Sequence, residues 1–311
     1  MFGFVGFVNG VFKLTSASII YFVNNGSFNM FGIIGYSYGN SSQLIDINIQ
    51  TEINNNQGYC VGALAGKLKS NQIKLEQINI HNSYISGCHL VGLVVAYLIG
   101  GEVYQVTSTS SQVYCVSQTT YSLRGAYVGI IGETVVQLNI QMCIVLNISI
   151  NSYSNQWWAI SGGIVGDTHS SPVIMLKTSV QHSQISASGP VSISVSSGGL
   201  VGYIYNSTLL LQNVQVSNSN ISGSNFISLV MCGGFFAVFR NMTTQINNCV
   251  IFSIQFSTQG QNVIVGILIG TDESLKQPFT TNNVISTGNN TLNEIYITNC
   301  DNIVSLTLSG C

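Results

Sequence analysis

Apolar and polar residues alternate along much of this chain. Segments such as "IKLEQINI" (73–80) and "LLLQNVQV" (209–216) place apolar side chains at nearly every second position. A period of two puts one set of side chains on one face, which predicts half-buried β-strands. Apolar spacing typical of helices is almost absent, and Asn, Ser and Gly separate the alternating segments. The pattern therefore predicts an all-β fold.

The alternating segments belong to an internal repeat. "LEQINIHNSYISG" (75–87) returns as "LQNVQVSNSNISG" (211–223) with six of thirteen positions identical. A short marker of small and aliphatic residues precedes each long alternating segment, as in "GGLVG" (198–202). The last small residue of each marker falls at positions 6, 35, 66, 96, 132, 166, 202, 237 and 270.

A near-constant spacing of this kind is the signature of a repeat architecture. Short strands with Asn, Ser and Gly corners predict a parallel β-helix, or β-solenoid, of about nine coils of roughly 30–36 residues each. No composition break marks a boundary, so we expect a single domain over 1–311. We also expect it to be a fragment or module of a longer chain.

The stretch "GGLVGYIYNSTLLLQNVQVSNSNISG" (198–223) resembles the GLUG motif, which is named for its glycine–aliphatic–glycine signature. Looser copies cover essentially the whole chain, although Ala96 and Ala237 replace the last glycine of their markers. The resemblance implies a right-handed parallel β-helix in a secreted or cell-surface protein.

Composition narrows the function classes. Charged residues make up 6% of the chain and the net charge is −2, which argues against binding nucleic acid or an anionic membrane. The longest apolar run, Val91–Gly101, is far shorter than the roughly 20 residues that a membrane-spanning helix needs. We therefore expect neither a nucleic-acid partner nor a transmembrane helix.

Cysteine usage favours an oxidising compartment. Eight cysteines occur without a C-x-x-C pair, and the four histidines lack ligand spacing, so no metal is expected. Spacings of 27 or 28 residues resemble one coil, and stacked strands lie close enough for a disulfide. The predicted pairs are Cys60–Cys88, Cys115–Cys143, Cys232–Cys249 and Cys300–Cys311. The alternative is buried, unbonded cysteines in the stack.

Seven Asn-X-Ser/Thr triplets are candidate N-glycosylation sites that fall near the expected corners of the coils. Glycans at corners would keep so uncharged a surface soluble, and they support a secreted protein. The seven are Asn25, Asn40, Asn147, Asn206, Asn220, Asn241 and Asn289.

Two carboxylates deserve a test as catalytic residues. Glu133 and Asp167 each follow the last glycine of adjacent markers, so they should stack about one strand spacing apart, with Tyr97 before and Tyr203 after. Such a pair could hold a sugar or calcium, or act as glycosidase carboxylates. The alternative reading is two solvated carboxylates on an outward face, and we expect no enzyme and no cofactor.

The surface and the ends suggest association. One ring of the Trp157–Trp158 pair should be exposed, either to stack on sugar or to pack against a neighbour. Consecutive aliphatic residues in each marker predict an outer apolar stripe that needs a cover, and the ends look uncapped. The sequence thus favours an extracellular structural protein, a building block of a filament or surface coat that binds copies of itself or adjoining parts of a longer chain. The alternative is a carbohydrate-binding adhesin or glycan-active β-helix.

Overall fold

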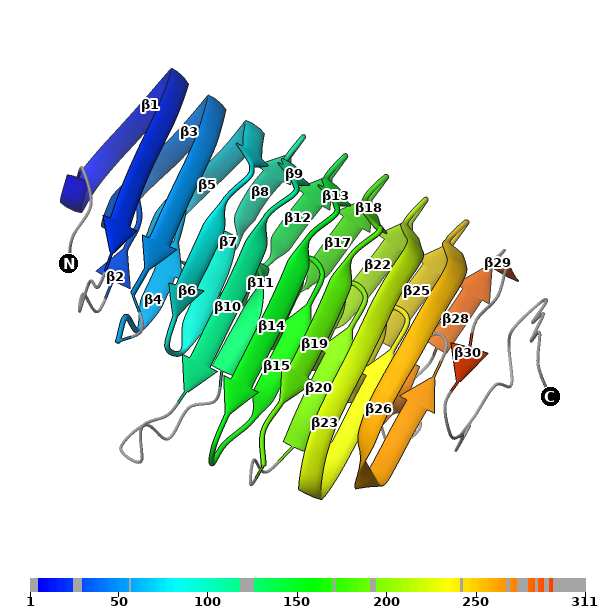
Figure 1. Cartoon of the computed structure of the whole chain (residues 1–311). Helices are drawn as coiled ribbons and strands as arrows, with labels where there is room; N and C mark the ends of the chain where they lie inside the picture. The colour runs from blue at the N-terminus through cyan, green and yellow to red at the C-terminus, as the bar shows by residue number, and fades with distance from the viewer. Residues whose placement is uncertain are drawn as a thin grey trace.

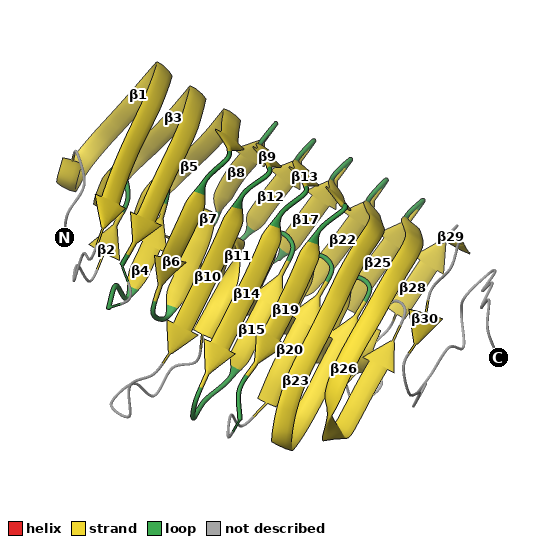
Figure 2. Ribbon diagram, in the orientation of Figure 1, coloured by secondary structure: helices red, strands yellow, loops and turns green. Residues whose placement is uncertain are grey.

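A computed structural model shows an all-β solenoid, in which parallel strands stack coil upon coil (Figure 1). Every element assigned in the described part of the chain is a strand (Figure 2). No helix capable of spanning a membrane occurs among these residues. The structure describes residues 5–24, 30–55, 57–117, 126–169, 172–190, 194–240, 243–266, 269–272, 279–282, 285–287 and 291–292.

Long strands follow several sides of a coil without interruption, whereas shorter ones follow one side. The long strands are β1 (Val5–Asn24), β3 (Ile34–Asn54), β5 (Ala65–His81), β7 (Leu90–Leu98), β11 (Ala126–Thr134), β23 (Gln215–Gly233) and β26 (Val250–Gly266). Before the marker bend lie β2 (Met30–Phe31), β4 (Cys60–Gly62), β15 (Ala159–Gly162) and β20 (Ser194–Gly198). After it lie β16 (Val165–His169), β21 (Val201–Tyr205), β24 (Phe236–Arg240) and β27 (Ile269–Asp272).

The remaining strands form the other sides of the coils. One side is made by β8 (Gly101–Tyr104), β12 (Leu138–Gln141), β17 (Val173–Leu176), β22 (Thr208–Gln212), β25 (Thr243–Asn247) and β28 (Phe279–Asn282). The next holds β9 (Thr107–Thr109), β13 (Ile144–Leu146), β18 (Ser179–Gln181) and β29 (Ile285–Thr287). The third holds β6 (Tyr84–Gly87), β10 (Gln112–Ser117), β14 (Ser149–Ser154), β19 (Gln184–Ser188) and β30 (Thr291–Leu292).

The marker residues set the register between coils. The apolar residue before the last small residue of each marker pairs with its counterpart in the next coil, so apolar side chains form a continuous column that is buried from Ile34 to Phe236. A single repeat cannot bury its apolar face alone, so stacking on neighbouring coils is what stabilises it. The column comprises Val5, Ile34, Ala65, Val95, Ile131, Val165, Val201, Phe236 and Ile269.

Two columns of left-handed residues turn the coils, and the second column begins at Asn82. Their φ angles lie between +47° and +57°, a region that Asn tolerates better than most residues. The two columns are five residues apart in the sequence. The first holds Ser16, Asp46, Gln77, Gln105, Met142, Lys177, Asn213 and Asn248, and the second holds Asn82, Ser110, Asn147, His182, Asn218 and Ser253.

Buried serines satisfy the backbone at the second of these corners. Ser111 Oγ accepts a hydrogen bond from the Ser83 amide of the preceding coil at 3.0 Å and donates to the Thr109 carbonyl at 2.8 Å. Ser219 does the same for the Ser183 amide and the Ser217 carbonyl. Because a buried amide without a partner is costly, these hydroxyls stabilise the turn.

The marker is a sharp bend. In four of the described markers the first glycine precedes two bend residues, as in Gly198, which is followed by Gly199 and Leu200, whereas β7 and β11 continue through theirs. A Cβ at Gly198 would overlap the Val201 carbonyl oxygen, and one at Gly162 would overlap the Val165 carbonyl oxygen. Only glycine fits where the backbone folds back this closely.

Because of this bend, the prediction of an outer apolar stripe is wrong. Both consecutive aliphatics, such as Leu200 and Val201, are buried in the main core. On the outer side the two strands of the bend face each other: Ile160 packs against Tyr203, and a Cβ at Gly202 would lie 2.5 Å from Ile160 Cγ2. The chain therefore covers its own marker segments.

The predicted disulfides are absent from the described residues, where the six cysteines are buried thiols. Cys60 pairs in register with Leu90, and Cys115 pairs with Gly87 and Ser152, so the predicted partners do not share a column. The cysteine spacing is shorter than the 37 residues that separate Cys115 from Ser152. Burial raises the pKa of the Cys232 thiol to about 12. The described cysteines are Cys60, Cys88, Cys115, Cys143, Cys232 and Cys249, whereas Cys300 and Cys311 lie outside the described residues.

Candidate functional site

The stacked Glu133–Asp167 pair is confirmed. Glu133 pairs in register with Asp167, with Tyr97 on one side and Tyr203 on the other. Lys67 precedes Tyr97 in the same column. These residues lie directly after the marker bend, on strands β5, β7, β11, β16 and β21.

Asp167 is not a solvated carboxylate. Its side chain is 2% exposed, its Oδ2 lies 3.1 Å from His169 Nδ1, and its Oδ1 has no hydrogen-bond partner among the described residues. Burial raises the pKa of Asp167, and the hydrogen bond from His169 opposes that rise. The same hydrogen bond raises the pKa of His169, which also feels the charge of Glu133. A half-buried Glu133 completes the acidic part of the column.

Aromatic rings surround this dyad. Trp158, immediately before β15, is 37% exposed and stacks on Tyr203 with ring centroids 6.2 Å apart and an interplanar angle of 14°. The His169 ring lies 5.8 Å from Tyr203 and 5.9 Å from Tyr205. Trp157 is half-buried, so the two tryptophans differ in exposure less than the prediction of one exposed and one buried ring implied. The rings come from both sides of the marker bend.

A second cluster of the same column joins a cation to aromatic faces. Lys67 Nζ lies 4.4 Å from the Tyr97 ring centroid and 5.7 Å from that of Tyr36. Such cation–π contacts hold the lysine along the surface of the stack. They add rigidity to this side of the solenoid.

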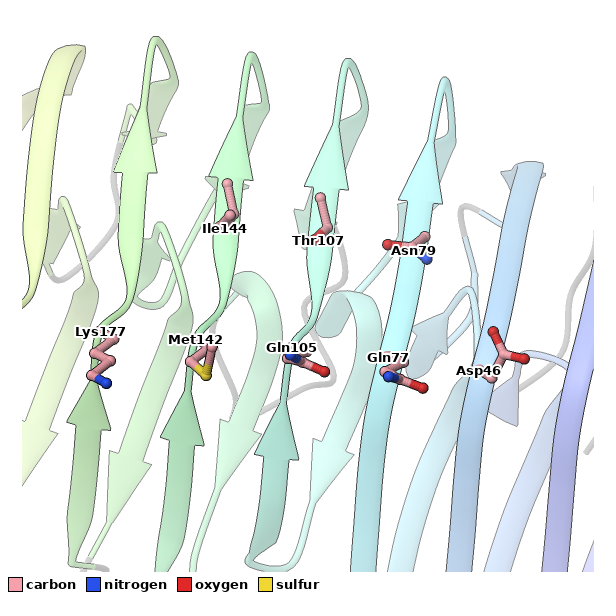
Figure 3. A pocket seen from close by; sticks show the side chains of 8 residues that line it. All are labelled: Asp46, Gln77, Asn79, Gln105, Thr107, Met142, Ile144 and Lys177. Atoms are coloured by element: carbon pink, nitrogen blue, oxygen red, sulfur yellow. The ribbon is translucent and has the colours of Figure 1, made fainter.

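A separate surface groove of about 610 Å³ follows the corners of the coils. Figure 3 shows Asp46, Gln77, Gln105, Met142 and Lys177 in one row on successive coils, with Asn79, Thr107 and Ile144 in the row beside it. Met142 and Ile144, near its middle, are 39% and 43% exposed. The groove is therefore polar at its two ends, where Asp46 and Lys177 lie. It is apolar at Met142 and Ile144, on the coil next to that of Lys177.

The candidate glycosylation sites differ in access. Asn40, Asn147 and Asn206 are exposed, and the last two occupy left-handed corner positions. Asn220 is half-buried, and its Oδ1 is buried without a hydrogen-bond partner among the described residues. Asn25, Asn241 and Asn289 lie outside the described residues.

Sequence reasoning missed the Asp167–His169 dyad and the Trp158–Tyr203 stack. An Asp-X-His spacing within one strand puts both side chains on one face, which could have revealed the dyad. The stack joins two coils across a bend that alternation alone does not show. Among the described residues, no group of three or more His, Cys, Asp or Glu side chains is arranged to hold a metal ion.

Comparison with known proteins returns no relative. No protein-family model, no curated protein and no solved structure matches this chain.

Proposed function

We propose that this chain is an extracellular structural protein, a building block of a filament or surface coat that grows by end-to-end stacking of solenoids. In this proposal the register column from Val5 to Ile269 corresponds to nine coils. No catalytic role is assigned to Glu133 or Asp167.

The observation that carries the proposal is the open face of β1. This 20-residue strand pairs with β3 and with no other described strand. Its inward residues, such as Phe12 and Leu14, are only partly buried, whereas Leu44 and Ile47 of the next coil are fully buried. The end of the apolar core is thus only partly covered among the described residues, and Figure 1 shows β1 as the outermost coil at the blue end of the solenoid.

Among the described residues, the outer edge of β1 also carries little of the usual protection. Val11, Ile20 and Phe22 are 73%, 65% and 67% exposed, and Lys13 is the one charged residue of the strand. Soluble proteins normally block such edges with charges, prolines or bulges. Instead, β1 offers backbone groups and apolar side chains to another strand.

A second copy of this chain is the occupant that fits. Every coil stacks in parallel on the next in nearly the same register, so a coil of another copy can extend the ladder beyond β1. Repeated head-to-tail contacts of this kind form open filaments when the rotation does not close.

Lateral contacts would use the corner groove rather than the marker segments. Met142 and Ile144 supply exposed apolar surface there, while Asp46 and Lys177 lie on coils at opposite ends of the groove. Two copies placed antiparallel along this groove would bring each Asp46 to the other copy's Lys177.

Exposed acceptor sites support a location outside the cell. Asn40, Asn147 and Asn206 can carry N-linked glycans without disturbing the core. A mass decrease after enzymatic removal of N-glycans from protein isolated from its source would support this location, and unmodified asparagines would contradict it.

Charged edge variants test the stacking directly. We expect Ile20→Lys combined with Phe22→Lys to abolish association measured by sedimentation velocity, because two lysines block the β1 edge. Val136→Lys is the control, since Val136 is 48% exposed in a turn away from that edge. A wild-type chain that sediments as a monomer at all concentrations, or double variants that associate normally, would contradict the proposal. If the wild-type chain is a monomer, an adjoining stretch of a longer polypeptide would be what covers the β1 face.

A further inference from the structure

The surface at the marker bend carries chemistry that end-to-end stacking does not use. On one side of the bend, Trp158 lies immediately before β15, which holds Ile160; on the other side, Asp167 and His169 lie on β16. Tyr203, from the following coil, contacts both sides through Ile160, Trp158 and His169. We propose that this surface is a carbohydrate-binding subsite in which a sugar ring stacks on Trp158 and its hydroxyl groups bind Glu133 and His169.

The aromatic geometry favours a sugar. Trp158 stacks on Tyr203 with nearly parallel planes, so the two rings form a stacked pair rather than a box of rings at steep angles. A flat aromatic face suits the C–H face of a pyranose, whereas a quaternary ammonium group needs several rings around it. Glu133 and Asp167 would repel phosphate groups, which argues against nucleotides.

The buried carboxylate is an independent observation. Asp167 is almost fully buried and its Oδ1 lacks a hydrogen-bond partner among the described residues, an arrangement that costs stability and calls for a reason. Its Oδ2 contacts His169 Nδ1, which fixes the ring so that Nε2 lies on the side away from Asp167. Asp167 is therefore a positioning residue, and His169 and Glu133 supply the polar contacts to the ligand.

Side chains beside the platform are already ordered. His169 packs against Tyr203 and Tyr205, and the Arg240 guanidinium lies 5.4 Å from the Tyr205 ring centroid. Binding sites of this kind combine an apolar surface with a few well-placed polar groups. Ordering before binding lowers the entropic cost of holding a ligand.

Tryptophan fluorescence gives a direct assay, because the chain has two tryptophans. A Trp157→Phe variant leaves Trp158 as the only tryptophan, which can be excited selectively over the tyrosines. We would titrate it with neutral hexasaccharides of β-linked glucose, N-acetylglucosamine and mannose. At least one should change the emission saturably, and Trp158→Ala in the wild-type chain should weaken its affinity, measured by calorimetry, about tenfold or more.

Matched variants separate binding from folding. Tyr38→Ala removes another exposed ring of the solenoid and should leave affinity unchanged. Asp167→Asn should lower the affinity and shift the pH midpoint of binding downward, because His169 loses the carboxylate that raises its pKa. Absence of a saturable emission change with every sugar at millimolar concentration would overturn the proposal. So would saturable binding of choline alone, or an equal loss of affinity in Tyr38→Ala.

Discussion

Single glycines determine whether the chain can make its bend. The Cβ of an alanine at Gly198 would overlap the Val201 carbonyl oxygen, which is backbone and has little room to move. We expect Gly198→Ala to lower the free energy of unfolding by about 3 kcal/mol, the upper part of the range for overpacking. Urea denaturation measures this change.

Gly6 provides the control for that substitution. A Cβ there would have no neighbour within 4 Å, so Gly6→Ala should change the free energy of unfolding by less than about 0.5 kcal/mol. Equal stability of the two variants would contradict the steric role assigned to the marker glycine.

The Asp167–His169 dyad makes stability depend on pH. The pKa of Asp167 is raised from 3.8 and that of His169 from 6.5, so the folded chain binds protons more tightly than the unfolded chain. The contribution of each group is complete below its ordinary pKa and is lost as the pH rises through the raised value. Stability should therefore fall with rising pH across this window.

The Asp167→Asn variant isolates the contribution of the Asp167–His169 dyad to the pH dependence of stability. Between about pH 4 and about pH 8 the urea midpoint of the wild type should fall more steeply than that of the variant. Parallel slopes would show that the dyad does not link protonation to folding.

At the scale of the element, buried serines of one corner have opposite roles. Ser111 bonds the Ser83 amide and the Thr109 carbonyl, whereas Ser108 Oγ is buried without a hydrogen-bond partner among the described residues. Ser111→Ala should cost about 1–3 kcal/mol because it leaves a buried amide unsatisfied. Ser108→Ala should be neutral or stabilising, and thermal unfolding of both variants checks the contrast. A loss of stability in Ser108→Ala as large as that in Ser111→Ala would contradict it.

The elements also show what the sequence predicted and what it could not. Alternation and the marker period predicted parallel strands, the register column and the Glu133–Asp167 stack, because these depend on side-chain period alone. The left-handed turns at Gln77, Met142 and Lys177 were not readable, since these residue types carry no preference for that conformation. The marker was mistaken for a straight strand, and that error produced the outer apolar stripe.

At the scale of the whole molecule, the corner groove predicts antiparallel pairing of solenoids. Asp46→Lys should weaken lateral association by placing a lysine opposite Lys177 of the other copy, and Lys177→Asp should weaken it similarly. A double variant that carries both changes in one chain should restore association, measured by light scattering. A double variant as weak as either single variant would contradict this arrangement.

The central claim is that solenoids of this chain stack end to end. Electron microscopy of protein isolated without refolding tests it most directly. The stacking proposal predicts filaments with an axial repeat of about 43 Å if its nine coils, at about 4.8 Å each, lie along the axis. Discrete particles, each a single solenoid with a covered β1 face, would contradict it.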